Sequence, residues 1–166
     1  MSEKMDREFI IDDLETENLE EALSLVWRVF LAYKPSDCVD EGTQEFKRFI
    51  DPDSFRQKIL HNGFRIWVCR NSRDKGKIVG VLATRPACHI SLLFVDEEYH
   101  RRGIAREMLN HVIGFYKTNR TNYEYKEITV NSSPYAHEAY RKLGFQDAEK
   151  EQTINGIRHI PMRKSL

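Results

Sequence analysis

The segment with the clearest chemical meaning is a basic turn at residues 99–106, with the sequence Tyr-His-Arg-Arg-Gly-Ile-Ala-Arg. A compact apolar run over residues 89–95 precedes this turn, and apolar residues recur at helical spacing after it. The turn is therefore expected to join a strand to the start of a helix. The first turn of a helix presents backbone N–H groups without partners and the positive end of the helix dipole. A phosphate or pyrophosphate is the ligand that this arrangement favours.

Individual residues of the turn suit an anion. Gly103 has no Cβ to block the close approach of a phosphate to the backbone, and the side chain of Ala105 is nearly as small. Arg101, Arg102 and Arg106 add full positive charges, and we expect at least one of them to contact phosphate. The ordinary alternative is that the three arginines only form the solvated beginning of a helix.

The composition limits the classes of function. The chain has 166 residues, which suits a single domain over residues 1–166 with a sizeable core. Its 26 basic and 26 acidic side chains cancel, so we expect neither nucleic acid nor an anionic membrane as a partner. The first residues alternate charged with apolar side chains, unlike a signal peptide, and no apolar run approaches the length of a membrane span.

The cysteine pattern bears on metal binding and location. Cys38, Cys69 and Cys88 are odd in number, and their spacings match no metal-binding motif. We therefore expect no metal site and a reducing, cytoplasmic location. Each thiol is expected to be structural, because buried free cysteine behaves as a small apolar residue.

The hydrophobic pattern predicts the elements that position the turn. Strands are expected at residues 8–11, 64–69, 77–83, 89–95, 124–130, 145–153 and 157–162. The last two strands are expected to form a hairpin across Asn155-Gly156. A first helix is expected to begin at the N-cap Thr16 and to end before Pro35, and two short helices are expected within residues 36–63. Two more helices are expected, one at about 102–117 and one at 134–143, which ends at the C-cap Gly144. This order predicts an α/β fold with helices on both faces of a sheet.

Three features together resemble the GNAT N-acetyltransferase superfamily. The first is residues 100–105, which match the Gly and Ala of the family's acetyl-CoA signature, although His100 stands where the family has Gln or Arg. The second is the preceding strand, residues 92–96. The third is Asn131 followed by residues 140–145, which resemble the family's Tyr-x-x-x-Gly-Phe ending. The resemblance covers roughly residues 77–150, whereas the first 70 residues match only in the order of elements.

This resemblance implies a mixed, mostly antiparallel sheet that splays into a V between the strand ending at Val95 and the strand ending near Val130. It implies acetyl-CoA as co-substrate, with the pantetheine arm in the cleft on the backbone of Leu93, Phe94 and Val95. The pyrophosphate would lie on the backbone amides of the turn, namely those of Arg101, Arg102, Gly103, Ile104, Ala105 and Arg106.

Further residues gain roles from the same resemblance. In family members, a Tyr at the position of Tyr140 protonates the departing CoA thiolate; the alternative is a core tyrosine. Many members place an Asn seven residues before this Tyr, where it contacts pantetheine. Here Asn131 lies nine residues before Tyr140 and Ser133 lies seven before it, so either residue could make the contact, or both could simply cap a loop.

His89 is the candidate general base. It lies six residues before Val95, where the histone-modifying branch of the family has a catalytic Glu. An imidazole titrates near neutrality, as a base that deprotonates an amine should. The alternative is a structural histidine at the start of a strand. His111 and His137 are expected to face solvent on helices.

Aromatic side chains of the N-terminal helices could form the wall of an acceptor pocket. Their helical spacing favours simple core packing instead. The residues concerned are Trp27, Phe30, Tyr33, Phe46 and Phe49.

These observations predict an enzyme that transfers an acetyl group from acetyl-CoA to a primary amine by direct attack in a ternary complex. The alternative is a non-catalytic acyl-CoA-binding or regulatory module on the same fold. A doubly wound nucleotide-binding domain is disfavoured, because no Gly-x-Gly-x-x-Gly follows an early strand. The acceptor, a small-molecule or peptide amine, stays open, as does a homodimer formed through the C-terminal hairpin.

Overall fold

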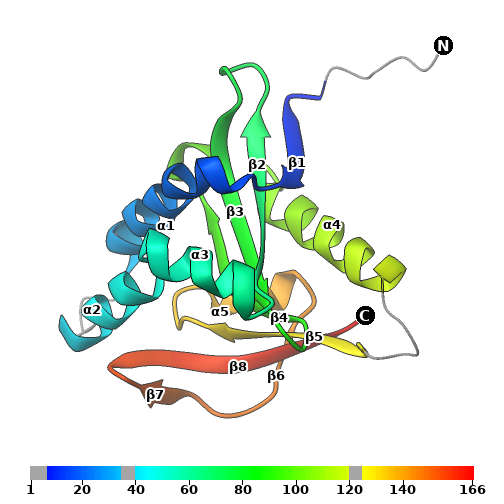
Figure 1. Cartoon of the computed structure of the whole chain (residues 1–166). Coiled ribbons are helices and arrows are strands. Elements are labelled where there is room, and N and C mark those ends of the chain that lie inside the picture. Colours follow the sequence, from blue (N-terminus) through cyan, green and yellow to red (C-terminus); the bar gives the residue numbers. More distant parts are fainter. Residues whose placement is uncertain (1–6, 35–39, 120–124) are drawn as a thin grey trace.

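The structure, a computed structural model, describes residues 7–34, 40–119 and 125–166. A mixed sheet forms its centre (Figure 1), with strand order β1-β2-β3-β4-β5-β8-β6 and with β7 paired to β8. Among the described strands only β4 and β5 pair in parallel, so the sheet is mostly antiparallel, as the family resemblance implied. The strands are β1 (Phe9–Asp13), β2 (Arg65–Asn71), β3 (Lys77–Arg85), β4 (His89–Val95), β5 (Glu127–Ser132), β6 (Gln146–Asp147), β7 (Gln152–Ile154) and β8 (Ile157–Ser165).

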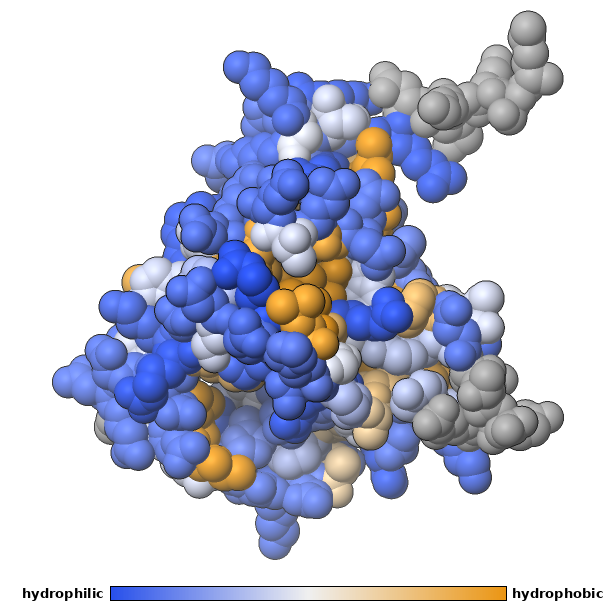
Figure 2. Space-filling model, in the orientation of Figure 1, coloured by the Kyte–Doolittle hydropathy of each residue, from blue (hydrophilic) through white to orange (hydrophobic). Residues whose placement is uncertain are grey.

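Helices cover both faces of the sheet (Figure 1). They are α1 (Leu19–Tyr33), α2 (Asp40–Phe49), α3 (Pro52–His61), α4 (Ile104–Asn119) and α5 (His137–Lys142), and 3-10 turns occur at Thr16–Asn18 and Glu97–Tyr99. No described helix is both long and apolar enough to cross a bilayer. Figure 2 shows the face that bears α1, α2 and α3, where hydrophobic side chains gather near the centre and hydrophilic ones surround them.

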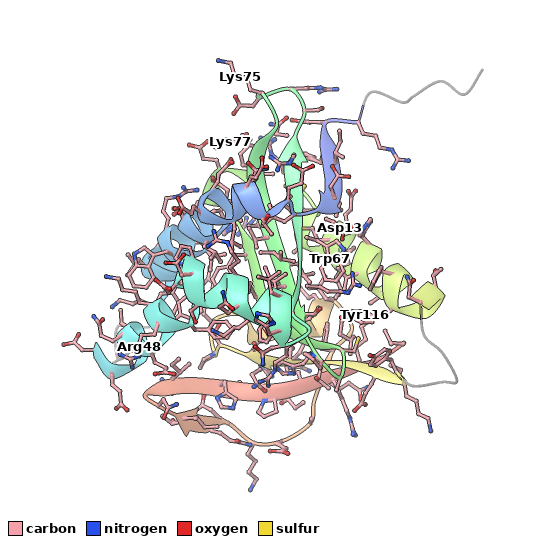
Figure 3. The ribbon with its side chains drawn as sticks, viewed as in Figure 1. Asp13, Arg48, Trp67, Lys75, Lys77 and Tyr116 are labelled. Carbon is pink, nitrogen blue, oxygen red and sulfur yellow. The ribbon has the colours of Figure 1, made fainter. Side chains whose placement is uncertain are left out.

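Two hydrophobic cores sandwich the sheet, one under α1 and α3 and the other under α4 and α5. β3 serves both, because Val81 and Ala83 belong to the first core while Val79 and Leu82 belong to the second. Trp67 of β2 meets α4 at the ring of Tyr116, 6.4 Å between centroids (Figure 3). Such apolar burial on both faces fixes the strands and the helices relative to one another.

Several predicted elements are confirmed with small shifts. The two short helices between residues 36 and 63 are α2 and α3, and the residues before α2 lie outside the described part of the chain. The hairpin turn at Asn155-Gly156 has positive φ at both residues (52° and 78°), as a two-residue turn requires. Cys69 and Cys88 are free and buried, as expected of structural thiols; Cys38 lies outside the described residues.

Three predicted boundaries are wrong. Thr16 is not the N-cap of α1: it opens a 3-10 turn, closed by a bond from the Asn18 N–H to the Glu15 carbonyl (2.9 Å), and α1 begins at Leu19. The helix before Gly144 begins at His137, because the preceding residues form a turn. The helix after the basic turn begins at Ile104 rather than near Arg102.

The strand predicted over residues 145–153 is also wrong, since it is split into β6 and β7. Both pieces pair with β8, on either side of the point where the N–H groups of Ala148 and Glu149 reach the carbonyl of Pro161 (2.8 and 3.5 Å). Pro161 has no N–H to continue a regular ladder there. The predicted strand at 124–130 is β5, and Glu124 lies outside the described residues.

The tip of the β7–β8 hairpin touches α2 through two glycines. A Cβ built on Gly42 would lie 2.5 Å from the carbonyl oxygen of Gly156. We expect Gly42→Ala to lower the free energy of unfolding by about 1–3 kcal/mol, because backbone must move to relieve the overlap. Gly114→Ala in α4 is the control, since nothing lies within 4 Å of its Cβ; it should raise stability by about 0.5–1 kcal/mol. Urea unfolding measures both, and equal effects would contradict the contact.

Candidate active site

A V-shaped opening separates β4 from β5. The two parallel strands pair only at His89 with Thr129 and at Ile90 with Val130, and they diverge beyond these positions. On its other edge β4 stays paired with β3 as far as Val95. One edge of β4 is therefore open beyond Ile90, as the family resemblance implied.

An extra residue in β4 marks the point of divergence. Ala83 of β3 opposes Leu92 and Thr84 opposes Ile90, so Ser91 has no residue opposite it. This β-bulge bends the strand and increases its twist. Among the described residues, the Ser91 Oγ is the buried side-chain polar atom that has no hydrogen-bond partner. A buried hydroxyl without a partner costs free energy, and a polar group of a ligand at this point would remove that cost.

The open edge of β4 carries backbone groups ready to bind a strand-like ligand. The Asp96 N–H bonds to the Val79 carbonyl (2.8 Å). In an antiparallel ladder every second residue bonds to the partner strand, so the N–H and C=O groups of Leu93 and Val95 point away from β3. Phe94, which the sequence analysis grouped with them, directs its backbone to β3 and its side chain to the core under α1.

A buried carboxylate fixes the end of β4. Asp96 follows the strand and is 4% exposed. Its Oδ2 accepts a hydrogen bond from Nη2 of Arg28 in α1 (2.6 Å), and its Oδ1 accepts one from the N–H of Glu98 (3.0 Å). Partnered in this way, the carboxylate ties the end of β4 to α1 and starts the turn that leads to the basic segment.

The basic turn has the backbone of an anion site. Arg101 and Gly103 have positive φ (62° and 77°), and α4 begins immediately afterwards at Ile104. No atom lies within 4 Å of a Cβ built on Gly103, so the backbone is open to a ligand at this point. Consecutive N–H groups before a helix, in an open concave turn, form a favourable environment for phosphate.

The three arginines of the turn point to different partners. Arg106 donates to the carbonyl oxygen of Lys142 at the end of α5 (3.1 Å). Arg102 lies over the ring of Tyr99, 5.1 Å from its centroid, and 3.7 Å from a carboxylate oxygen of Glu8. Arg101 is exposed and forms no ion pair with the described residues. Of the three, Arg101 is the one whose guanidinium is free for a phosphate.

Tyr140 lies in α5 and is buried, with its ring edge-on to Phe145 at 5.4 Å. Burial raises its pKa, so the phenol keeps its proton at neutral pH. Its hydroxyl makes no hydrogen bond within the described part of the chain. The structure thus contains the protonated phenol that the sequence analysis assigned, on the α4 and α5 side of the sheet.

His89 lies at the closed end of the V. Its Nδ1 is 2.8 Å from the hydroxyl of Thr129, its neighbour on β5. Desolvation, and after it the electrostatic influence of the nearby Arg85 and His159, lowers its pKa to about 4. The imidazole is therefore neutral at pH 7 and has one ring nitrogen able to accept a proton. Arg85 of β3 opposes His89, and Arg163 of β8 opposes Thr129. The base of the V therefore carries two arginines.

The two candidates for the pantetheine contact differ in their hydrogen bonding. The Ser133 Oγ accepts a hydrogen bond from the N–H of Ala136 (3.1 Å), which closes the turn before α5. Asn131 is exposed on β5, and its side-chain amide bonds to none of the described residues. The amide of Asn131 is therefore the freer of the two groups.

The aromatic residues of α1 and α2 form one stack that reaches β4. Phe30 stacks on Phe46 at 4.1 Å, and Phe46 lies 5.9 Å from Phe94 of β4. All are half-buried, so they are both core and surface.

His111 is exposed as expected, whereas His137 is partly buried against Asp147 (2.6 Å), so that prediction is wrong for His137. No group of three potential metal ligands occurs among the described residues.

Sequence reasoning missed the residues whose importance depends on register or on distant contacts. Ser91, Asp96 and Tyr135 belong to this group. An extra residue in a strand leaves no mark in a single sequence, and the partner of Asp96 is 68 positions away. The acidic residue directly after an apolar strand was the available signal for Asp96.

Comparisons with known proteins agree with this geometry. The family model described as "Acetyltransferase (GNAT) domain" matches residues 34–166. A search of curated proteins finds no match.

Among solved structures, a GCN5-related N-acetyltransferase from Rhodopseudomonas palustris superposes with a TM-score of 0.75 at 18% identity, covering 95% of both chains. The PaiA N-acetyltransferase from Thermoplasma acidophilum in complex with coenzyme A gives 0.73 at 11% identity, covering 96% of this chain and 100% of that one. The ribosomal-protein-S18-alanine N-acetyltransferase from Escherichia coli gives 0.65 at 20% identity, covering 95% and 93%. With the family model spanning most of the sequence, the chain belongs to the GNAT acetyltransferase family.

Proposed function

We propose that this protein transfers the acetyl group of acetyl-CoA to a primary amine, by direct attack of the amine on the thioester in a ternary complex. One observation carries this proposal: the open edge of β4 at Leu93 and Val95 leads directly into the glycine turn at the start of α4. A pantetheine arm needs strand-like backbone partners and a pyrophosphate needs an anion turn. Here both features lie within residues 93–104 of the chain.

Each step of the reaction has a group of this chain to assist it. The outward N–H of Leu93 can polarise the thioester carbonyl as the amine nitrogen bonds to its carbon. When the C–S bond breaks, Tyr140 can donate a hydrogen bond or its proton to the sulfur. The proton lost by the attacking amine passes to water through neutral His89, whose lowered pKa makes it a relay that does not keep the proton. The products are an amide and a thiol.

Both classes of acceptor have precedents among proteins of similar structure. A spermidine N-acetyltransferase chimera superposes with a TM-score of 0.63 at 15% identity, and the ribosomal-protein-S18-alanine enzyme at 0.65. We therefore propose an amine acceptor, either a small molecule or a peptide. A cytoplasmic location and a homodimer stay predictions.

A panel of amines tests the proposal. Purified protein is mixed with acetyl-CoA and, in separate wells, with polyamines, amino acids, aminoglycosides and peptides; release of free thiol is followed with a chromogenic disulfide. We expect at least one amine to raise thiol release well above slow hydrolysis, and Tyr140→Phe to abolish most of the increase. If acetyl-CoA binds but no amine raises thiol release, the non-catalytic acyl-CoA-binding module is the better interpretation.

The histidine at the base of the V gives a pH-dependent prediction. Because folding lowers the pKa of His89 from 6.5 to about 4, the unfolded chain binds a proton there more readily between these values. The contribution of neutral His89 to the free energy of unfolding is therefore fully present above pH 6.5 and is lost as the pH drops toward 4. The ring remains partly in contact with water, so we expect wild type to lose about 1–2 kcal/mol more than His89→Gln across this range.

Urea unfolding at pH 7, 5.5 and 4.5 measures this difference. Parallel curves for wild type and His89→Gln would show that His89 is not held neutral by the fold. The same variant tests the catalytic role, since a base or a proton relay predicts a lower kcat at pH 7 whereas a structural histidine predicts only the change in stability.

A further inference from the structure

The carbonyl of Val95 on the open edge of β4 already has a partner. The Nε2 of His100 lies 2.8 Å from the Val95 oxygen. A carbonyl oxygen only accepts hydrogen bonds, so the imidazole donates its Nε2–H to it. His100 thus places a side-chain N–H on a strand edge that is otherwise open beyond Ile90.

One tyrosine packs on the His100 ring, and a second tyrosine packs on the first. Tyr33, the last residue of α1, packs against the imidazole with 5.4 Å between ring centroids and 37° between the planes. On its other side Tyr33 meets Tyr135 at 5.2 Å and 36°. Tyr135 belongs to the segment that follows β5. The three rings therefore form a row from the segment after β4, across the end of α1, to the segment after β5.

The donor that His100 supplies is of the kind that pantetheine supplies. Pantetheine contains two secondary amides, whose N–H groups bind outward-pointing strand carbonyls as an added strand does. Val95 is such a position, because its backbone points away from β3. An imidazole and a pantetheine amide would both approach this oxygen from the open side of β4.

We propose that the Nε2–H of His100 donates a hydrogen bond to the Val95 carbonyl in the free protein, and that an amide N–H of pantetheine displaces it when acyl-CoA binds. This inference rests on the proposed function. His100 is held on the open edge by its bond to the Val95 oxygen and by Tyr33, which in turn packs against Tyr135. Binding acyl-CoA then exchanges one hydrogen bond for another, and it also breaks the contact between His100 and Tyr33.

A different role for His100 predicts the opposite sign. If the imidazole instead binds a phosphate of CoA, its removal weakens acyl-CoA binding. If the carbonyl accepts bonds from both donors at once through its two lone pairs, removal leaves the affinity unchanged or lower. Only the exchange predicts that binding becomes tighter when the side chain is removed.

Calorimetry with two ligands separates these cases. We expect His100→Ala to bind acetyl-CoA about 3- to 10-fold more tightly than wild type, the gain from not having to break one hydrogen bond. S-acetylpantetheine, which lacks the pyrophosphate and the nucleotide, should show the same gain. His111→Ala, an exposed histidine on α4, is the matched control and should leave both affinities unchanged.

Unchanged or weaker binding of S-acetylpantetheine by His100→Ala overturns the inference and leaves the proposed function standing. A wild-type protein that binds neither ligand contradicts the proposed function itself.

A measurement on wild type provides a second test that needs no variant. Nitrogen-15 spectra of labelled histidine should show that the His100 Nε2 resonance shifts when acetyl-CoA is added, as the ring leaves the carbonyl. A His100 resonance that stays in place at saturation with acetyl-CoA overturns the exchange.

Discussion

Replacing Gly103 by valine is expected to weaken acetyl-CoA binding at least about 100-fold, corresponding to the loss of one or two charge-assisted hydrogen bonds. Gly103 has a φ of +77°, which β-branched residues rarely adopt. The valine methyl groups would also enter the open space over the backbone N–H groups at the start of α4. Calorimetry measures the affinity, and a circular dichroism melt shows whether the variant is folded.

Gly76 provides a matched control for backbone strain. It has nearly the same φ, +71°, and nothing lies within 4 Å of its Cβ, but it belongs to the turn between β2 and β3. Gly76→Val should therefore lose a similar amount of stability, about 1–2 kcal/mol, and keep wild-type affinity. If both variants lose affinity equally, or if Gly103→Val binds within twofold of wild type, the pyrophosphate does not lie on this turn.

Replacing Tyr140 by phenylalanine is expected to lower kcat about 100-fold and to leave acetyl-CoA affinity nearly unchanged, since loss of a general acid costs about 100- to 10,000-fold. The lower end applies for a physical reason. Burial raises the pKa of the phenol, whereas an ordinary thiol titrates at about 8.5. Full proton transfer to the thiolate is then uphill, and the phenol stabilises the leaving sulfur mainly by hydrogen bonding.

The Tyr140→Phe variant should fold normally. Its ring keeps the edge-on contact with Phe145, and the hydroxyl that is removed bonds to none of the described residues. Steady-state kinetics with a saturating amine gives kcat, and calorimetry gives the affinity. A kcat within about twofold of wild type, less than ~0.5 kcal/mol of barrier, would assign the proton to another group.

Local signals in the sequence were sufficient for most of the architecture. Helical periodicity identified α1 to α4, and the Asn155-Gly156 turn identified the β7–β8 hairpin, because both patterns depend on neighbouring residues only. The boundaries failed where tertiary geometry overrides local preference. Thr16 is an acceptable N-cap by type, yet the chain makes a tighter turn there; Pro161 interrupts a ladder whose strands meet only in the folded protein.

The site was predictable in its backbone and less so in its side chains. The strand, glycine and helix in sequence located the anion turn and the open strand at Leu93 and Val95. The directions of Arg102 and Arg106 depend on Tyr99 and on the end of α5, which no spacing rule reveals. The contact of His100 with Val95 and Tyr33 depends on how far α1 extends over β4, which only the packed structure shows.

The extra residue in β4 has a consequence for how such a cleft can arise or be lost. Ile90 faces the core under α4 and Leu92 faces the core under α1. Two directly successive residues of a regular strand point to opposite faces in just this way. An in-frame deletion of the Ser91 codon would therefore leave every apolar side chain of β4 on its present side and restore an unbroken ladder with β3. Both cores are satisfied without this residue, so a single codon separates a regular β3–β4 ladder from the bulged one that bends β4 where it leaves β5.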